Sequence, residues 1–113
     1  MISFFKDAKI EQEFQEFGFV RFANIGNNNV HEILELHKKL NIPDDMGKNF
    51  NVGLNCNNLE KRIHMREALV NILEDFFKEI TNNRFIHSAT LMDKISHQYS
   101  IVPAHQDWTY TDE

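Results

Sequence analysis

The sequence predicts an α+β fold, in which N-terminal helices pack on a short antiparallel sheet formed by residues 85 to 105. Apolar residues recur at helical spacing as far as about Asn83, and the composition then changes to one typical of strands. Hydrophobic residues make up 42% of the 113 positions and ten are phenylalanine, which indicates a globular chain with one modest core. No repeat or linker divides the chain. We therefore expect a single domain, mainly helical over residues 1–83, with strands in residues 84–113.

The first expected element is a helix from Ala8 to Phe17. Asp7 is a plausible N-cap, and Gly18 stands where a left-handed C-cap would end the helix. Apolar side chains at i, i+4 and i+7 share one face, namely Ile10, Phe14 and Phe17. The following segment, Phe19 to Ala23, reads as a short strand.

A second helix follows the turn signal at residues 26–29. The pattern of an amphipathic helix is given by Val30, Ile33, Leu34, His37 and Leu40. Asn41 and Pro43 end it. Residues 44 to 58 are rich in Asn, Asp and Gly, and we expect them to form a long irregular loop.

The third helix has the strongest signal and is expected from about Asn58 to Ile80. Asn57 followed by Glu60 resembles a capping box, and Asn82 with Asn83 ends the helical pattern. Its wide apolar stripe predicts contact with two other elements, through Leu59, Ile63, Leu69, Val70, Ile72, Leu73, Phe76, Phe77 and Ile80.

Two strands are expected after the helices. Phe85 to Ile95 is the first candidate and Tyr99 to Val102 the second. The polar residues 96–98 between them suggest a hairpin. The phenylalanines are assigned to the core.

Composition excludes several classes of partner and setting. Twelve basic and seventeen acidic side chains give a net charge of −5, so there is no cationic surplus for nucleic acid or for an anionic membrane. Cys56 is the only cysteine, which excludes an internal disulfide and a thiolate zinc cluster. Neither a signal peptide nor the roughly 20 apolar residues of a membrane span is evident. We expect a soluble protein in a reducing, cytoplasmic setting.

The candidate chemistry lies in His105 and Asp107. Residues two apart on a strand point to the same side, so both side chains can reach one metal ion. An imidazole and a carboxylate, joined by a distant second histidine, form the facial triad of non-haem Fe(II) oxygenases. The tripeptide alone is weak evidence, and a surface pair at a strand end is the alternative.

The residues around this pair resemble a known family. The string from Val102 to Glu113, V-P-A-H-Q-D-W-T-Y-T-D-E, is similar to the L-P-x-H-Q-D-W-x-x-V-D-E signature of phytanoyl-CoA dioxygenase-like proteins. The segment Phe17 to Val20 resembles the family's F-x-x-x-G-F-V opening. Phe50 to Arg62 looks like its loop into the long helix, and the strand ending at Lys94 like its first barrel strand.

The resemblance implies a jelly-roll of the cupin type (a double-stranded β-helix) and a 2-oxoglutarate-dependent hydroxylation of a small organic substrate. His105 and Asp107 would be the first two iron ligands. Gln106 and Trp108 would project to the opposite face or line the adjacent wall. Lys94 is a candidate for binding a 2-oxoglutarate carboxylate, although a strand-end lysine whose charge simply reaches solvent is the alternative.

In that family the third ligand, a histidine, and the basic residue that holds the cosubstrate's far carboxylate come many residues after the H-x-D motif. No residue here is assigned to either role, so we expect the N-terminal portion of such an enzyme, with an incomplete barrel and no activity on its own. Its open strand edge would favour self-association. A second hypothesis is a non-catalytic helical interaction module that associates through its unpaired strands, with H-Q-D incidental.

Four other histidines have ordinary structural interpretations. His97 lies in the connecting turn and would join a metal site only if the hairpin folded over His105. His64 and Glu67 are one helical turn apart, which suits a metal but also an exposed pair. His31 and His37 are on the second helix, and we expect them to be structural.

Overall fold

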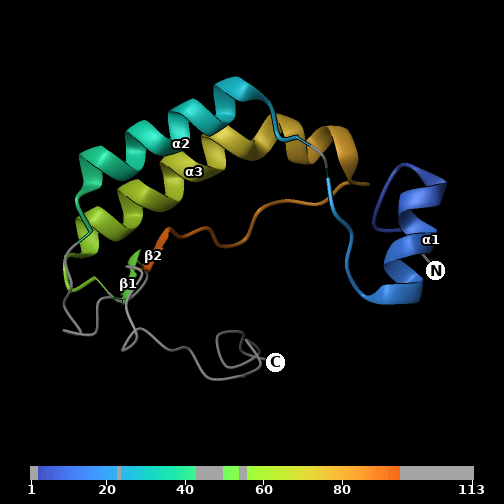
Figure 1. The fold of residues 1–113 in the computed structure, drawn as a ribbon, viewed down its shortest axis with the longest axis horizontal. Helices are drawn as coiled ribbons and strands as arrows, with labels where there is room; N and C mark the ends of the chain where they lie inside the picture. The colour runs from blue at the N-terminus through green and yellow to red at the C-terminus, as the bar shows by residue number, and fades with distance from the viewer. Residues whose placement is uncertain (1–2, 23, 43–49, 54–55, 95–113) are drawn as a thin grey trace.

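The computed structural model describes residues 3–22, 24–42, 50–53 and 56–94. Two helices lie side by side, and an extended segment runs along them towards a small two-stranded sheet (Figure 1). A third, shorter helix lies at the far end of the molecule with the N-terminal residues. The elements are α1 (Ala8–Phe17), α2 (Asn27–Leu40), β1 (Phe50–Val52), α3 (Leu59–Ile80) and β2 (Met92–Lys94).

The prediction of α1 is confirmed at both ends. The Asp7 carboxylate accepts hydrogen bonds from the backbone N–H groups of Lys9 and Ile10, at 2.8 and 3.0 Å. Gly18 ends the helix with a φ of 76°, in the left-handed region that glycine tolerates. These local signals are sufficient because both caps lie next to the helix in sequence.

The expected strand at residues 19–23 is wrong over the described residues 19–22, which form no strand. Phe22 packs its ring against Phe5 and Phe76, with centroids 5.9 and 5.7 Å apart. The segment is thus held by a side chain rather than by a ladder of backbone hydrogen bonds.

The N-terminal residues are attached to the end of α3. Phe5 and Thr81, both buried, form an antiparallel bridge. Backbone hydrogen bonds run from Lys6 to Ile80 at 3.0 Å and from Asn82 to Phe4 at 2.9 Å. Residues more than seventy positions apart are joined here, a pairing that no local pattern signals.

Glu11 gives this attachment a pH dependence. Its carboxylate accepts hydrogen bonds from the backbone N–H groups of Phe5 and Phe4, both at 2.8 Å. The Phe5 hydrogen bond is the main cause that lowers the pKa of Glu11, and the Gln15 side chain adds to it. A lowered pKa means that the charged carboxylate stabilises the folded form above the ordinary glutamate pKa of about 4.3. That stabilisation is lost as the pH falls through the lower folded value.

We therefore expect the amide proton resonances of Phe4 and Phe5 to shift on acidification below about pH 4. Glu11→Gln should remove this titration and shift both resonances at neutral pH. Glu13→Gln on the same helix is the matched control and should leave the titration in place. An NMR pH titration of the three proteins makes the comparison. Titration of the two amides that survives Glu11→Gln would assign it to another group.

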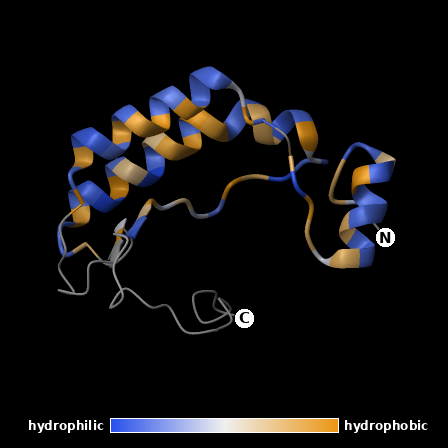
Figure 2. Ribbon diagram, in the orientation of Figure 1, coloured by the Kyte–Doolittle hydropathy of each residue, from blue (hydrophilic) through white to orange (hydrophobic). Residues whose placement is uncertain are grey.

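The core lies between α2 and α3, in four buried side chains: Leu36, Leu40, Met65 and Leu69. Part-buried residues extend it, namely Ile33, Ile42, Ala68, Ile72, Ala89 and Leu91. Figure 2 shows hydrophobic and hydrophilic stretches alternating along both helices, as expected where each helix buries one face. Ala89 and Leu91 belong to the extended segment before β2, so this segment packs on the same core.

The predicted end of α2 is confirmed, and the predicted start of α3 is wrong by one residue. Asn41 ends α2 in the left-handed region, with a φ of 42°, as its sequence signal predicted. The α3 cap is wrong by one residue, because Asn58 rather than Asn57 is the N-cap. The Asn58 side chain accepts a hydrogen bond from the Lys61 N–H at 2.9 Å. The helix begins at Leu59, so the side-chain amide of Asn58, and not that of Asn57, stands directly before the first free N–H groups of the helix.

The sheet differs from the expected one. β1 lies within the segment predicted to be a loop, so that prediction is wrong at residues 50–52. It pairs antiparallel with β2, with Phe50 opposite Lys94 and Val52 opposite Met92. Of the expected strand over residues 85–95, only 92–94 is a strand in the described part of the chain. The expected partner at residues 99–102 lies outside the described residues, and the jelly-roll stays a prediction.

The assignment of all phenylalanines to the core is also wrong. Phe17, Phe19 and Phe85 are 58%, 65% and 79% exposed. By contrast, Phe5 is buried, and Phe4, Phe14, Phe22 and Phe76 are part-buried and stack in one aromatic group with it. The exposed rings leave apolar surface at the end of α1 and on the segment that follows α3.

Candidate functional site

The structure places only one of the three predicted site residues. Lys94 is the last residue of β2, whereas His105 and Asp107 lie outside the described residues. Gln106, Trp108 and His97 also lie outside them. The described part of the candidate site is therefore Lys94 on β2, together with the residues that hold this strand in place.

Lys94 is on the face of β2 that is turned away from the helices. The side chain of Asp93 reaches α2, where one carboxylate oxygen lies 3.2 Å from Nε2 of His37. Neighbouring side chains on a strand point to opposite faces, so Met92 and Lys94 point away from α2, and both are exposed. The Lys94 ammonium is thus accessible to an anion on this outer face.

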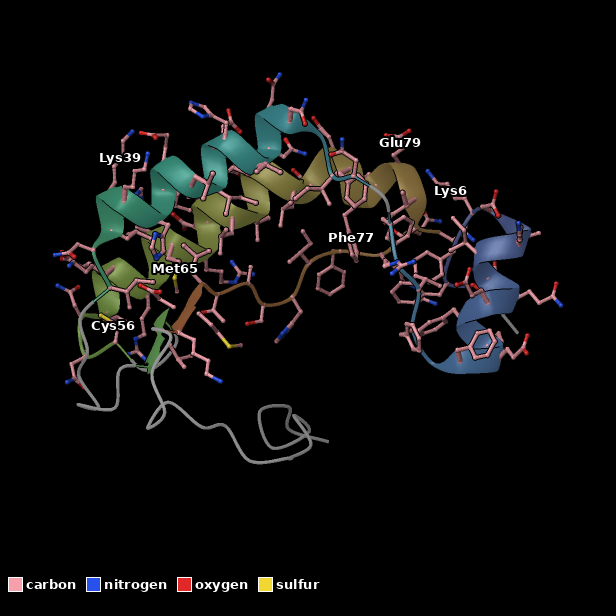
Figure 3. The ribbon with its side chains drawn as sticks, in the orientation of Figure 1. Lys6, Lys39, Cys56, Met65, Phe77 and Glu79 are labelled. Atoms are coloured by element: carbon pink, nitrogen blue, oxygen red, sulfur yellow. The ribbon has the colours of Figure 1, made fainter. Side chains whose placement is uncertain are left out.

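β2 is anchored by the residues that precede it. The Leu91 carbonyl accepts a hydrogen bond from the Gly53 N–H at 2.9 Å, and the Leu91 N–H points to the sulfur of Met65 at 3.4 Å. Arg66 donates from Nε and one terminal nitrogen to the His87 carbonyl, at 3.2 and 3.0 Å. Met65 lies on the side of α3 that faces the small sheet (Figure 3). Backbone and side-chain contacts together fix where the chain leaves the helices.

Met65 and Gly53 were not singled out from the sequence. Met65 is 3% exposed, and a Cβ built on Gly53 would lie 2.3 Å from the Met65 sulfur and 3.0 Å from the Thr90 hydroxyl. The close approach of three segments at this point requires a residue without a side chain. A glycine between apolar positions in a polar stretch was the available signal.

Within the described ranges, the histidine candidates on the helices lie in ordinary surroundings. His64 and Glu67 are both exposed on α3, which agrees with an ordinary surface pair. His31 is exposed, and His37 is half-buried against Asp93. Over the residues that the structure describes, no group of three His, Cys, Asp or Glu side chains could hold a metal ion.

A groove of about 540 Å³ runs between the outer faces of α2 and α3. His31, Glu35 and Lys39 line it from α2, and His64 and Asn71 from α3. The Lys38 side chain donates a hydrogen bond to Glu35 at 2.8 Å, and this contact lowers the Glu35 pKa. The lining thus mixes two carboxylates, those of Glu32 and Glu35, with a lysine and two imidazoles, so it does not favour a ligand of one charge.

Comparisons with known proteins give no relative for this chain. No family model, no curated protein and no solved structure matches it. The likeness to phytanoyl-CoA dioxygenases therefore depends on the residues quoted above. Among the described residues, no helix has the length and apolar character needed to cross a membrane.

Proposed function

We propose that this chain supplies two ligands, His105 and Asp107, to the Fe(II) site of a 2-oxoglutarate-dependent dioxygenase that hydroxylates a small organic substrate. The observation that carries the proposal is the string from Val102 to Trp108, V-P-A-H-Q-D-W. One imidazole and one carboxylate are a donor set suited to Fe(II), which would supply the activation of O₂. The proposal also includes the jelly-roll fold and an intracellular, cytoplasmic setting.

The arrangement around β2 supports a role for Lys94 in this proposal. An exposed ammonium on the sheet face opposite the helices can pair with one carboxylate of a dicarboxylate such as 2-oxoglutarate. The helices cover the other face, through Leu91 in the core and Asp93 at α2. Anchoring by Met65 and Gly53 would keep the ammonium in a fixed position, as a binding group requires.

The proposal is tested by metal binding. Co(II), followed by its visible absorption under reducing conditions, is expected to bind weakly to the isolated chain, because two protein ligands do not complete a facial triad. His105→Ala and Asp107→Ala should each abolish that binding. His64→Ala and His31→Ala, exposed helical histidines, are matched controls and should leave it unchanged. Binding that survives both ligand substitutions would remove this pair from any metal site.

2-Oxoglutarate supplies a second readout. Its addition should change the Co(II) spectrum of the wild-type chain, and Lys94→Ala should raise the concentration that is needed, whereas Lys94→Arg should largely preserve it. Turnover of 2-oxoglutarate by the isolated chain with Fe(II) should be undetectable. Measurable turnover would instead show a third ligand within the chain or from a partner, and His97→Ala would be the first variant to examine.

A second candidate function is an interaction module that associates through its strands and apolar surface. The exposed side chains of Met92 on β2 and of Val30 and Leu34 on α2 favour it. In the described part of the chain the sheet has two strands, and an edge strand presents unpaired backbone N–H and C=O groups with which another chain can pair.

We expect the isolated chain to form dimers or larger species at high concentration. Met92→Lys places a charge on the exposed face of β2 and should shift the population to monomer. Phe17→Ser removes an equally exposed apolar residue from α1 and should have no such effect. Size-exclusion chromatography with light scattering measures the three proteins. A wild-type chain that is monomeric at about 1 mM would count against association through this surface.

A further inference from the structure

The extended segment between α3 and β2, residues 84–90, belongs to no sheet ladder in the described part of the chain. It runs along α3 as a single trace (Figure 1), and within the described ranges none of its residues makes a backbone–backbone hydrogen bond. The carbonyl of His87 instead accepts hydrogen bonds from the Arg66 side chain, at 3.2 and 3.0 Å. An extended chain with unpaired N–H and C=O groups is the structure to which a further strand adds.

This segment is held in place at both ends. The Asn82 N–H donates to the Phe4 carbonyl at 2.9 Å, and the Leu91 carbonyl accepts from the Gly53 N–H, also at 2.9 Å. Ala89 and Leu91 pack against the core between α2 and α3. A strand that is fixed before its partner binds loses little further conformational freedom, and this favours pairing.

The sequence of the segment lacks the residues that protect strand edges. From Phe85 to Met92 it reads F-I-H-S-A-T-L-M, with no lysine, arginine, aspartate, glutamate, proline or glycine. Exposed edge strands are usually protected by charged residues or proline, and short uncharged segments without proline are the ones that pair with identical copies. Phe85 and Met92 are 79% and 63% exposed. Both ends of the segment are thus accessible to another strand.

The segment is also complementary to itself. Two apolar residues stand at each end, Phe85 and Ile86 at one and Leu91 and Met92 at the other, and polar or small residues lie between them. Antiparallel alignment of two copies about Ser88 puts the apolar end of one beside that of the other, with Phe85 opposite Leu91. Apolar cross-strand pairs stabilise a ladder, and no like charges oppose each other over residues 85–91.

We propose that residues 85–91 are the surface on which a second copy of this chain docks, as an antiparallel strand in a two-fold symmetric dimer with Ser88 opposite Ser88. This dimer rests on the second candidate function, association through strands, and gives it an interface and a partner. A second copy is favoured over an unrelated strand because the match of apolar ends is a property of this segment alone.

Charge variants at Ser88 test the pairing. Ser88 is exposed, so Ser88→Lys and Ser88→Glu should keep the fold, which circular dichroism checks, but each puts like charges opposite one another in the dimer. Each should raise the dimer dissociation constant about fivefold, the effect of one unfavourable cross-strand pair. An equimolar mixture of the two variants should restore association, because opposite charges then face each other.

Asn71→Lys is the matched control, since it adds the same charge at an exposed position of α3 and should leave the dissociation constant unchanged. Sedimentation equilibrium measures all the proteins and the mixture. Amide hydrogen exchange locates the interface independently. At high protein concentration, the amides of residues 85–91 that point to the partner should exchange more slowly than at low concentration, whereas amides in the middle of α3 should not change.

The possible results are distinguishable. A wild-type chain that stays monomeric at high concentration would overturn both this dimer and the second candidate function. Dimers that are insensitive to the charge at Ser88, or that leave the amides of residues 85–91 unprotected, would overturn this interface alone, because the contact then lies elsewhere. Weakened association that the mixture does not restore would overturn the pairing of Ser88 with its own copy.

Discussion

Gly53→Ala is expected to lower the free energy of unfolding by about 1–3 kcal/mol, the usual cost of overpacking a filled site. The new Cβ would lie 2.3 Å from the sulfur of Met65 and 2.5 Å from its terminal methyl carbon. The methionine end is flexible, but it is buried and receives the Leu91 N–H, so moving it breaks the anchor of β2. Urea unfolding followed by circular dichroism gives the difference.

A double-mutant cycle identifies the cause. If the clash with Met65 is the source of the loss, Gly53→Ala should cost much less in a Met65→Ala background, because the obstructing atoms are gone. Gly18→Ala is a useful contrast, since its φ of 76° is strained for alanine although nothing lies within 4 Å of the added carbon. If Gly53→Ala lowers the free energy of unfolding equally in both backgrounds, glycine is required by the backbone at this position and not by the contact with Met65.

The helices could be predicted from the sequence where their signals are local. Asp7 and Gly18 cap α1 at the expected positions, and Asn41 ends α2. The buried face of α3 could be predicted less well than the ends of the helices. Leu59 and Ile63, placed in the apolar stripe, are exposed, while Met65 and Leu69 are among its buried residues. The spacing of apolar residues along the sequence gives the period of the stripe. Which part of a wide stripe is buried depends on the side from which α2 packs.

The strands could be predicted less well, because pairing depends on residues distant in sequence. Phe50 and Val52 alternate with a polar residue, but three residues are too few for a clear strand signal, and this segment becomes β1 by pairing with β2. The extended residues before β2 have strand composition, yet one of their carbonyls, that of His87, bonds to Arg66 of α3. A run of β-branched and aromatic residues therefore indicated extended backbone but not its partner.

The candidate site was predicted from a sequence motif, but the residues that hold it in place are different ones. His105 and Asp107 come from a seven-residue string that can be read directly in sequence. His37, Gly53 and Met65, which hold β2, come from three separate segments. Such a supporting set has no spacing rule, so a single sequence identifies the chemistry of a site more readily than what positions it.

Met65→Ala is expected to have the largest effect on stability, a loss of about 2–5 kcal/mol in the free energy of unfolding. Met65 is 3% exposed and belongs to the four-residue core between α2 and α3. Truncation leaves a cavity beside Leu40 and Leu69 and also removes the sulfur that accepts the Leu91 N–H at 3.4 Å. Loss of packing and loss of an acceptor should therefore add at one position.

Two controls separate these contributions. Met65→Leu keeps the apolar volume but not the sulfur, and should cost less than about 1.5 kcal/mol. Met92→Ala removes a methionine that is 63% exposed, and should change stability by less than about 0.5 kcal/mol. Hydrogen exchange at Leu91 should rise in both Met65 variants and stay constant in Met92→Ala, since only the first two lose the acceptor. If Met65→Ala unfolds at the same urea concentration as the wild type, Met65 does not join the helices to β2 in the way its contacts indicate.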